Sequence, residues 1–123
     1  MIVLSLPFPV SQNLIWRAFV QGRSTRTIKS ETYRKWEAQA APVVEAEMVG
    51  REPYDVPVAV RLHIRQPDKR RRDLDNMSKA CLDQLNGRVM TDDSLVHDLH
   101  LSWDTTPGEA RALVTVFPLE AVT

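Results

Sequence analysis

Basic and acidic side chains follow one another directly in the middle of the chain. Four consecutive cations, Lys69, Arg70, Arg71 and Arg72, precede the carboxylates of residues 73 and 75, and a second acidic pair follows at residues 92 and 93. Carboxylates alone repel a polyanion, whereas carboxylates that hold Mg²⁺ attract and polarise phosphate, and guanidinium groups bind phosphate oxygens with paired donors. The pattern therefore predicts metal-assisted chemistry on a nucleic-acid backbone.

Two interpretations of these carboxylates remain open from the residues alone. In the first, Asp73 and Asp75 bind metal, and Lys79, four residues after Asp75 on one helix face, contacts phosphate or stabilises a leaving group. In the second, Asp73 caps the helix, and Asp75 and Lys79 form an exposed ion pair worth less than about 1 kcal/mol. Asn76 either caps the helix or contacts the ligand. Taken alone, the spacing favours the second interpretation.

Length and composition bound the class of protein. A chain of 123 residues fits a single domain, 1–123, with a core of its own. Sixteen basic and sixteen acidic residues cancel, which argues against coating nucleic acid through bulk charge. The one cysteine, Cys81, forms no intrachain disulfide, residues 1–7 are too short for a signal peptide, and no apolar run approaches the ~20 residues of a membrane span. We expect a cytoplasmic protein without a membrane role.

Glycine usage excludes another class. The chain has four glycines and no glycine-rich phosphate loop, which disfavours a phosphohydrolase acting on nucleotides. We expect no small organic cofactor.

Apolar periodicity predicts the order of elements. Strands are expected over residues 2–6, 58–65, 94–103 and 110–117, the last two as a hairpin, and a small irregular hairpin within residues 14–28. Ser30 is expected to cap a helix that runs to about Val49 with a kink or break at Pro42, and a second helix is expected over residues 74–85. The order β-α-β-α-β-β, with the irregular hairpin after the first strand, predicts an α+β fold in which two main helices cover one face of a small mixed sheet.

Three segments carry a family resemblance. Residues 67–79 read P-D-K-R-R-R-D-L-D-N-M-S-K, and residues 92–96 read D-D-S-L-V. They closely resemble the RusA family of Holliday junction resolvases, whose pattern is roughly P-D-x-R-R-R-D-L-D-N-x-x-K and then D-D-x-x-V. Residues 6–13, L-P-F-P-V-S-Q-N, are similar to the family's L-P-x-P-P-S-x-N start. The similarity covers nearly the whole chain and implies a RusA-like fold.

The resemblance implies a function and its residues. Such enzymes are small homodimers, often prophage-encoded, that cut four-way junction DNA by paired Mg²⁺-dependent incisions, and Mn²⁺ is the expected substitute ion. The carried-over catalytic and metal-binding residues are Asp73, Asp75 and Asp93, with Lys79 as the essential lysine. The carried-over DNA-binding residues are Lys69, Arg70, Arg71, Arg72 and Asn13.

Two departures from the family pattern and one geometric question limit the transfer of residue roles from the family to this chain. Val10 stands where the family usually has a second proline, and residues 86–91 are short and lack an expected aromatic residue, so sequence preference or wedge contacts are expected to differ. A helix of about 12 residues rises ~18 Å, whereas residues 86–92 span roughly 23 Å when extended. Asp93 therefore reaches the site either within one chain or across a dimer, and its neighbour Asp92 has no assigned role.

The remaining distinctive residues mostly favour structural roles. The histidines lack zinc spacing, and His97 is expected to pack on an apolar strand face. Cys81, Trp36 and Trp103 are expected in the core. Trp16, in a basic segment, is the residue expected to stack on unpaired bases at a junction.

The function that we expect is therefore Mg²⁺-dependent resolution of Holliday junctions in DNA recombination and repair. The alternative is a non-catalytic nucleic-acid-binding or regulatory protein of the same fold, in which the acidic cluster is only structural. Metal-dependent cleavage distinguishes the two.

Overall fold

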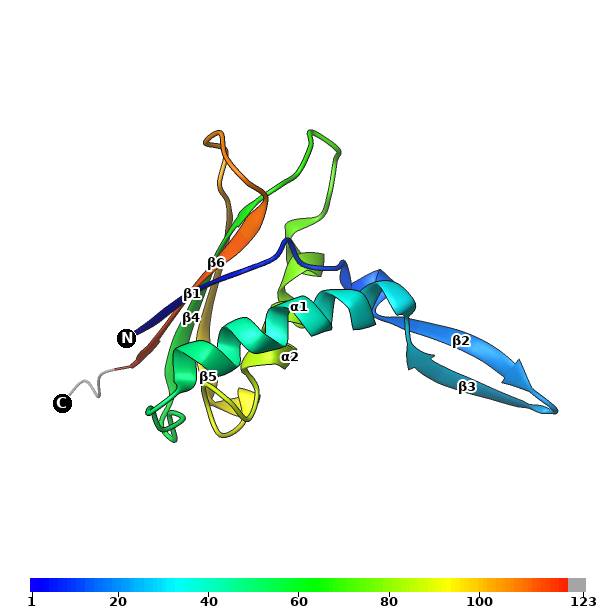
Figure 1. The fold of residues 1–123 in the computed structure, drawn as a ribbon, viewed down its shortest axis with the longest axis horizontal. Coiled ribbons are helices and arrows are strands. Elements are labelled where there is room, and N and C mark those ends of the chain that lie inside the picture. Colours follow the sequence, from blue (N-terminus) through cyan, green and yellow to red (C-terminus); the bar gives the residue numbers. More distant parts are fainter. Residues whose placement is uncertain (120–123) are drawn as a thin grey trace.

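Alternating apolar residues build a four-stranded sheet, which occupies the left part of the view in Figure 1. The computed structural model describes residues 1–119. The strands are β1 (Ile2–Leu6), β4 (Val58–Arg65), β5 (Val96–Trp103) and β6 (Arg111–Pro118), in the spatial order β1-β6-β4-β5. The last four residues of the predicted domain, 120–123, lie outside the described part.

The strand register places one set of side chains on the buried face. Strand β6 runs antiparallel to both β1 and β4, so that Val116 lies between Ile2 and Val60. All three side chains are buried. Because successive side chains point to opposite faces of a strand, every second residue of these strands also lies on this face. The face forms one side of the hydrophobic core.

The predicted terminal hairpin is wrong. Strand β5 pairs parallel to β4, and β6 pairs antiparallel to the other edge of β4, so β5 and β6 are separated by β4. A parallel pair requires a crossover connection, which residues 66–95 supply. The prediction failed because an alternating strand reads the same whether its partner is parallel or antiparallel.

The first helix, α1 (Glu31–Met48), begins as predicted. The Ser30 side chain accepts a hydrogen bond from the Tyr33 backbone amide at 3.1 Å. Ala40 and Val44 are both fully buried on either side of Pro42. The helix continues through Pro42, so the predicted break is wrong, because packing on both sides of the proline holds the helix together.

The second helical segment differs from its prediction at its start. It opens as a 3₁₀ turn, η2 (Leu74–Met77), and becomes the helix α2 (Ser78–Leu85) only after it. Cys81 is completely buried, as predicted, and burial raises its pKa to about 12. Helices α1 and α2 contact each other, and α1 packs against β1. The predicted α+β fold with a mixed sheet and two helices is confirmed.

A second, two-stranded sheet leaves the body of the molecule. Strands β2 (Trp16–Gln21) and β3 (Ser24–Lys29) pair antiparallel over all six residues of each strand, so the predicted irregular hairpin is a regular one. Figure 1 shows this hairpin extending far beyond the N-terminal end of α1.

Three further predictions concern single side chains. Trp36 is buried and Trp103 is partly buried against the core, which confirms both core assignments. His97 is exposed, so its predicted packing is wrong. The register between β4 and β5 shifts between Val58 and Ala59, and this irregularity leaves His97 without a partner on β4. No described helix is both long enough and apolar enough to cross a bilayer.

Candidate active site

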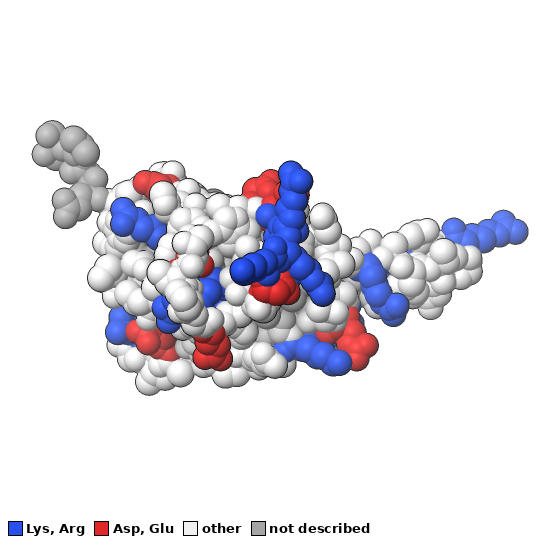
Figure 2. Space-filling view, turned by 90° about the horizontal axis from the view of Figure 1, so that it is seen from above, with Lys and Arg blue, Asp and Glu red and all other residues white. Residues whose placement is uncertain are grey.

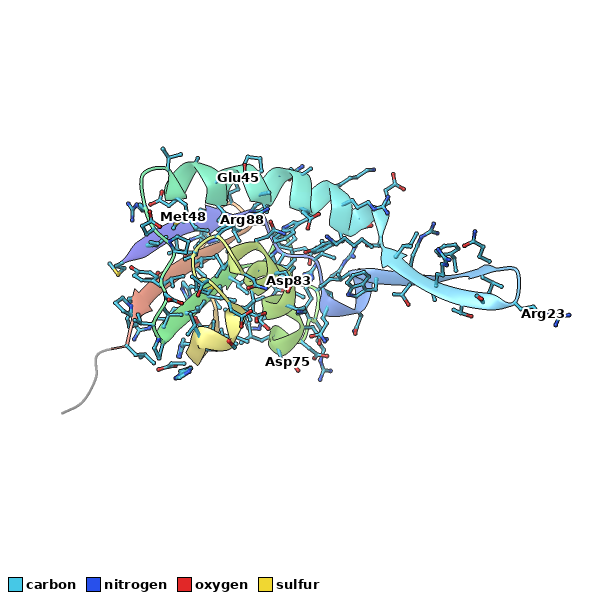
Figure 3. All side chains as sticks on the ribbon, turned by 90° about the horizontal axis from the view of Figure 1, so that it is seen from below. Arg23, Glu45, Met48, Asp75, Asp83 and Arg88 are labelled. Atoms are coloured by element: carbon cyan, nitrogen blue, oxygen red, sulfur yellow. The ribbon has the colours of Figure 1, made fainter. Side chains whose placement is uncertain are left out.

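The first acidic pair lies at the start of the 3₁₀ turn η2. Asp73 occupies the position before the turn, yet its side chain makes no capping hydrogen bond. Asp75 lies within the turn, and both residues are exposed. Figure 3 shows Asp75 at the outer edge of the body. The predicted capping role of Asp73 is therefore wrong, and both carboxylates are accessible to a ligand.

The basic loop directly before η2 contains three exposed cations, of which Arg70 only approaches Asp68 at 3.8 Å, and one cation that is firmly held. Lys69, Arg70 and Arg71 are exposed, and Figure 2 shows blue side chains gathered on this upper surface. Arg72 is different, because its guanidinium donates to Asp68 at 2.7 and 3.2 Å. These hydrogen bonds lower the pKa of Asp68 to about 2 and raise the pKa of Arg72.

Further contacts fix the Arg72 side chain. It also donates to Gln66 at 2.9 Å and lies over the Phe8 ring, 5.2 Å from its centroid. Its side chain is only 20% exposed. Arg72 therefore holds the loop in shape, while the three cations before it remain available for phosphate.

The lysine of the predicted site pairs with a different carboxylate from the one expected. Lys79 Nζ lies 2.8 Å from Asp83 Oδ1, one helical turn further along α2. The predicted pair with Asp75 is absent because Asp75 belongs to the 3₁₀ turn, whose periodicity differs from that of the α-helix carrying Lys79. The hydrogen bond to Asp83 raises the pKa of Lys79, and the nearby charge of Asp93 adds to this effect.

The second acidic pair returns to the same helix within one chain. Asp93 opens the 3₁₀ turn η3 (Asp93–Leu95), which packs against α2. Its backbone amide donates to Asn86 Oδ1 at 3.0 Å, and this bond ties η3 to the end of α2. Asp92 caps η3 by accepting from the Ser94 amide at 2.9 Å, and the hydrogen bonds from Ser94 lower the pKa of Asp92. Asp92 therefore has a structural role, and Asp93 remains accessible.

The donor chemistry of the three carboxylates suits a hard divalent cation. Asp73, Asp75 and Asp93 supply oxygen ligands, which Mg²⁺ prefers, and their side-chain oxygens accept no hydrogen bond from the residues described. Among residues 1–119, however, no three His, Cys, Asp or Glu side chains converge closely enough to hold a metal ion. The ligand type fits, while the side chains are not gathered around one point.

The two N-terminal DNA-binding candidates lie outside the acidic segment. Asn13 is an exposed residue of the 3₁₀ turn η1 (Gln12–Leu14), which contacts η2. Trp16 opens the protruding hairpin and is 52% exposed. The structure thus places Asn13 beside the acidic turn and Trp16 at the base of the arm.

A buried polar network supports the helix that carries Lys79. Gln84 is 2% exposed, donates to Glu37 at 3.2 Å and accepts from Arg88 at 2.8 Å. Glu37 also pairs with Lys29, the last residue of the hairpin, at 3.3 Å. The network joins α2, α1 and the base of the arm.

Sequence reasoning missed Asp83 and the positioning roles of Asn86 and Gln84. Figure 3 shows Asp83 further into the body than Asp75, on the same green segment. The four-residue spacing from Lys79 to Asp83 was a readable signal for an ion pair. The contacts of Asn86 and Gln84 join residues that the sequence does not link by any spacing rule.

Comparison with known proteins agrees with this arrangement. The model of the family described as endodeoxyribonuclease RusA matches residues 7–116. A crossover junction endodeoxyribonuclease of Enterobacteria phage 82 is 34% identical over 82 residues, and so is the protein of the same name from Escherichia coli K12. Each alignment covers 67% of this chain and 64% of the relative, so the chain spans slightly less than two thirds of these relatives.

A more distant relative aligns over more of the chain. The crossover junction endodeoxyribonuclease of Aquifex aeolicus is 23% identical over 117 residues, which cover 94% of this chain and 88% of the relative. The family match contains the basic loop, both acidic pairs and Lys79. The chain therefore belongs to the RusA family of endodeoxyribonucleases.

Proposed function

We propose that the protein is a Mg²⁺-dependent, structure-selective endodeoxyribonuclease that resolves four-way DNA junctions by paired, symmetric incisions. One observation carries the proposal. The carboxylates of Asp73 and Asp75, which make no capping hydrogen bond, directly follow a loop of exposed cations, and the chain brings Asp93 back to the same helix, near Lys79. The substrate is inferred from family membership and from the names of the relatives.

The acidic residues and the lysine have separate tasks in this proposal. Asp73, Asp75 and Asp93 would hold Mg²⁺, or Mn²⁺ as a substitute, which when bound activates water and stabilises charge on the phosphate. The hydrogen bond that Lys79 donates to Asp83 raises the pKa of Lys79 and so favours its protonated form. Its ammonium group, close to Asp93, is suited to neutralise an oxyanion at the scissile phosphate.

Two basic surfaces provide the binding energy for DNA. Lys69, Arg70 and Arg71 lie next to the acidic turn and hold the phosphates around the cut. The protruding hairpin carries Trp16 and several arginines, and residues 16–30 contain no carboxylate. Figure 2 shows blue side chains along this arm. The arm is placed to follow a duplex arm of the junction, with the indole available for base stacking.

A homodimer is the simplest assembly for two symmetric cuts. Resolution of a junction requires two equivalent sites, and a two-fold axis supplies them from one short chain. The sheet face opposite the helices carries apolar side chains, among them Val3, which is 43% exposed, and Phe117, which packs under Arg61. We propose that this face forms the subunit contact. Because the proposed substrate is DNA, we also propose that the protein acts in the cytoplasm.

The first test compares cleavage of labelled four-way junction, duplex and single strand, with Mg²⁺ and with a chelator. We expect cleavage of the junction only with the metal. Asp75→Asn should abolish cleavage while junction binding stays equal or becomes stronger, because the change removes a metal ligand and also reduces repulsion of phosphate. Glu52→Gln, an exposed change in the loop after α1, is the matched control and should cut normally. Undiminished cutting by Asp75→Asn would contradict the proposed site.

A second test addresses the dimer. Light scattering should report close to twice the chain mass of 14.0 kDa. A mixed dimer with one Asp75→Asn subunit should produce nicked junctions in place of resolved duplexes. If mixed dimers lose even nicking, the site is shared between subunits, and a monomer that makes paired cuts contradicts the assembly.

One observation supports the second candidate, a non-catalytic junction-binding or regulatory protein. The described acidic side chains do not converge into a group that would hold a metal. If this candidate is correct, the parent protein binds junctions and neither Mg²⁺ nor Mn²⁺ produces any cleavage.

A further inference from the structure

A cavity of about 450 Å³ opens directly beside Asp73. Its walls come from the loop after β1, the start of α1 and the basic-acidic segment, and they include Phe8, Val10, Leu14, Asn76 and Met77. This volume lies within the range of pockets that bind small organic groups. Asp73 and Arg71, which also line the cavity, have roles assigned above, whereas its apolar wall has none.

The cavity has the chemistry of a stacking site with a polar edge. One wall of the cavity is apolar and consists of Phe8, Pro9, Val10 and Leu14. The Leu14 side chain is 58% exposed and is therefore available for contact with a ligand. Ser11 and Asn76 also line the cavity, and the side chains of these two residues form no hydrogen bond within the described part of the chain. Apolar contact combined with a free amide is the combination with which proteins hold and read a single nucleobase.

The walls are held in place before any ligand binds. Trp36 donates from its indole nitrogen to the Pro7 carbonyl at 3.1 Å, and the Ser30 amide donates to the Ile15 carbonyl at 2.8 Å. These bonds fix both ends of the apolar wall to α1. On the other side, Arg72 is stacked on Phe8 and is clamped by Asp68. A pre-formed pocket loses less free energy when it orders a ligand.

We infer that this cavity receives one unstacked nucleobase next to the scissile phosphate and so determines the base preference of cleavage. The inference rests on the proposed function, because Asp73 then marks the position of the phosphate. Asn76 is the residue that reads the base edge, since an amide presents both a donor and an acceptor. Arg71, exposed at the rim, holds the flanking phosphate. Removal of a base from the stack is repaid by contact with the apolar wall.

A fluorescence experiment tests occupancy without any need for cleavage. The adenine analogue 2-aminopurine, whose emission increases when it leaves the stack, is placed in turn at each nucleotide flanking the cut, with a chelator present. We expect a several-fold increase at one position with the parent protein and none with Ser11→Phe, which fills the cavity. Gln12→Ala, an exposed change in the same loop outside the cavity, is the matched control and should keep the increase.

A cleavage experiment tests the reading residue. Junctions carrying all sixteen dinucleotides at the crossover should be cut by the parent protein with a best-to-worst ratio of at least about 10-fold, the discrimination typical of one bidentate base contact. Asn76→Ala should reduce this ratio to within about 3-fold of uniform cutting, whatever its overall rate.

Several results would overturn the inference. These are a bound parent protein with unchanged emission at every position, an equal increase with Ser11→Phe, or an unaltered preference in Asn76→Ala. A change in oligomeric state of Ser11→Phe would assign the cavity to a subunit contact instead. If the protein binds and cuts junctions but fails these tests, only the base pocket is rejected, whereas a protein that binds no junction rejects both this inference and the proposed function.

Discussion

The division of the basic loop into exposed and firmly held cations leads to a quantitative prediction. Lys69, Arg70 and Arg71 are exposed, and Arg70 approaches Asp68 only loosely, at 3.8 Å with its side chain 81% exposed. Replacement of these three residues by alanine should therefore remove three phosphate contacts without removing any packed side chain. We expect weaker binding to every DNA shape and an unchanged base preference, because phosphate contacts carry no sequence information.

The magnitude follows from counterion release. Each phosphate neutralised contributes about −0.9 to the slope of log K against log salt for duplex DNA, so three contacts contribute about −2.7. Between 50 and 200 mM salt, a fourfold change, the parent protein should lose roughly 40-fold more affinity than the triple variant. The difference between the two proteins should therefore be largest at low salt.

Fluorescence anisotropy of a labelled junction, measured with a chelator at four or more salt concentrations, gives both slopes. A matched control replaces Lys35 and Arg51 by alanine. These two residues pair with glutamates of α1, and their replacement should leave the slope unchanged. If the slope of the triple variant equals that of the parent, the loop is only a solvated face and does not contact DNA.

Arg72→Ala provides the contrasting case. Its guanidinium is already held by Asp68 and Gln66, so its removal should change the salt slope by much less than one phosphate contact. The loop should instead lose its shape, with a lower midpoint of thermal unfolding and a lower cleavage rate. If the slope of log K against log salt instead becomes shallower by about 0.9, the value for one phosphate contact, Arg72 exchanges Asp68 for a DNA phosphate on binding.

Further predictions concern stability. Gln84→Leu removes the buried amide that joins α2 to α1, and chemical denaturation should show a loss of about 1–3 kcal/mol; an unchanged midpoint would show that the network adds nothing. Gly108→Ala would place a Cβ in steric overlap with the Arg65 guanidinium, at a backbone φ of +154°, and should destabilise the fold by about 1–2 kcal/mol, with the displaced guanidinium visible in a crystal structure. The hydrogen bond from Arg72 lowers the pKa of Asp68 from 3.8 to about 2 in the folded protein. As the pH falls, Asp68 is therefore protonated in the unfolded chain before it is protonated in the folded protein. The stabilisation is complete above pH 3.8 and is lost as the pH falls towards 2. Thermal melts of the parent protein and Asp68→Asn should therefore converge over this range, and a constant difference would contradict the assignment.

Local sequence signals predicted those elements that depend on local interactions. Alternation over residues 58–65 gave β4, and the capping Ser30 with apolar residues at helical spacing gave α1. The partner of β5 was not predictable in this way. The turn after Trp103 resembles a hairpin turn, yet β6 passes beyond β5 to lie between β1 and β4, and only the completed sheet selects that position.

The site was predicted at the level of residue type and motif, and less well at the level of contacts. Asp73, Asp75, Asp93 and Lys79 were named from the family pattern, whereas the pairing of Lys79 with Asp83 was not foreseen. The reason is that four-residue spacing predicts a pair only within a continuous α-helix, and the chain changes from a 3₁₀ turn to an α-helix at Ser78.

The parallel pairing of β4 with β5 explains why the two acidic pairs meet at one helix. A parallel crossover must return along the length of the sheet, and the eight residues of α2 cover about 12 Å of this return. The turn with Asp75 therefore precedes the helix, and the turn with Asp93 follows it and is tied back by Asn86. Lys79, near the start of α2, remains close enough to Asp93 to be affected by its charge. Sequence analysis predicted the helix between the two acidic pairs, but the parallel pairing of the strands that this helix connects became visible only in the completed sheet.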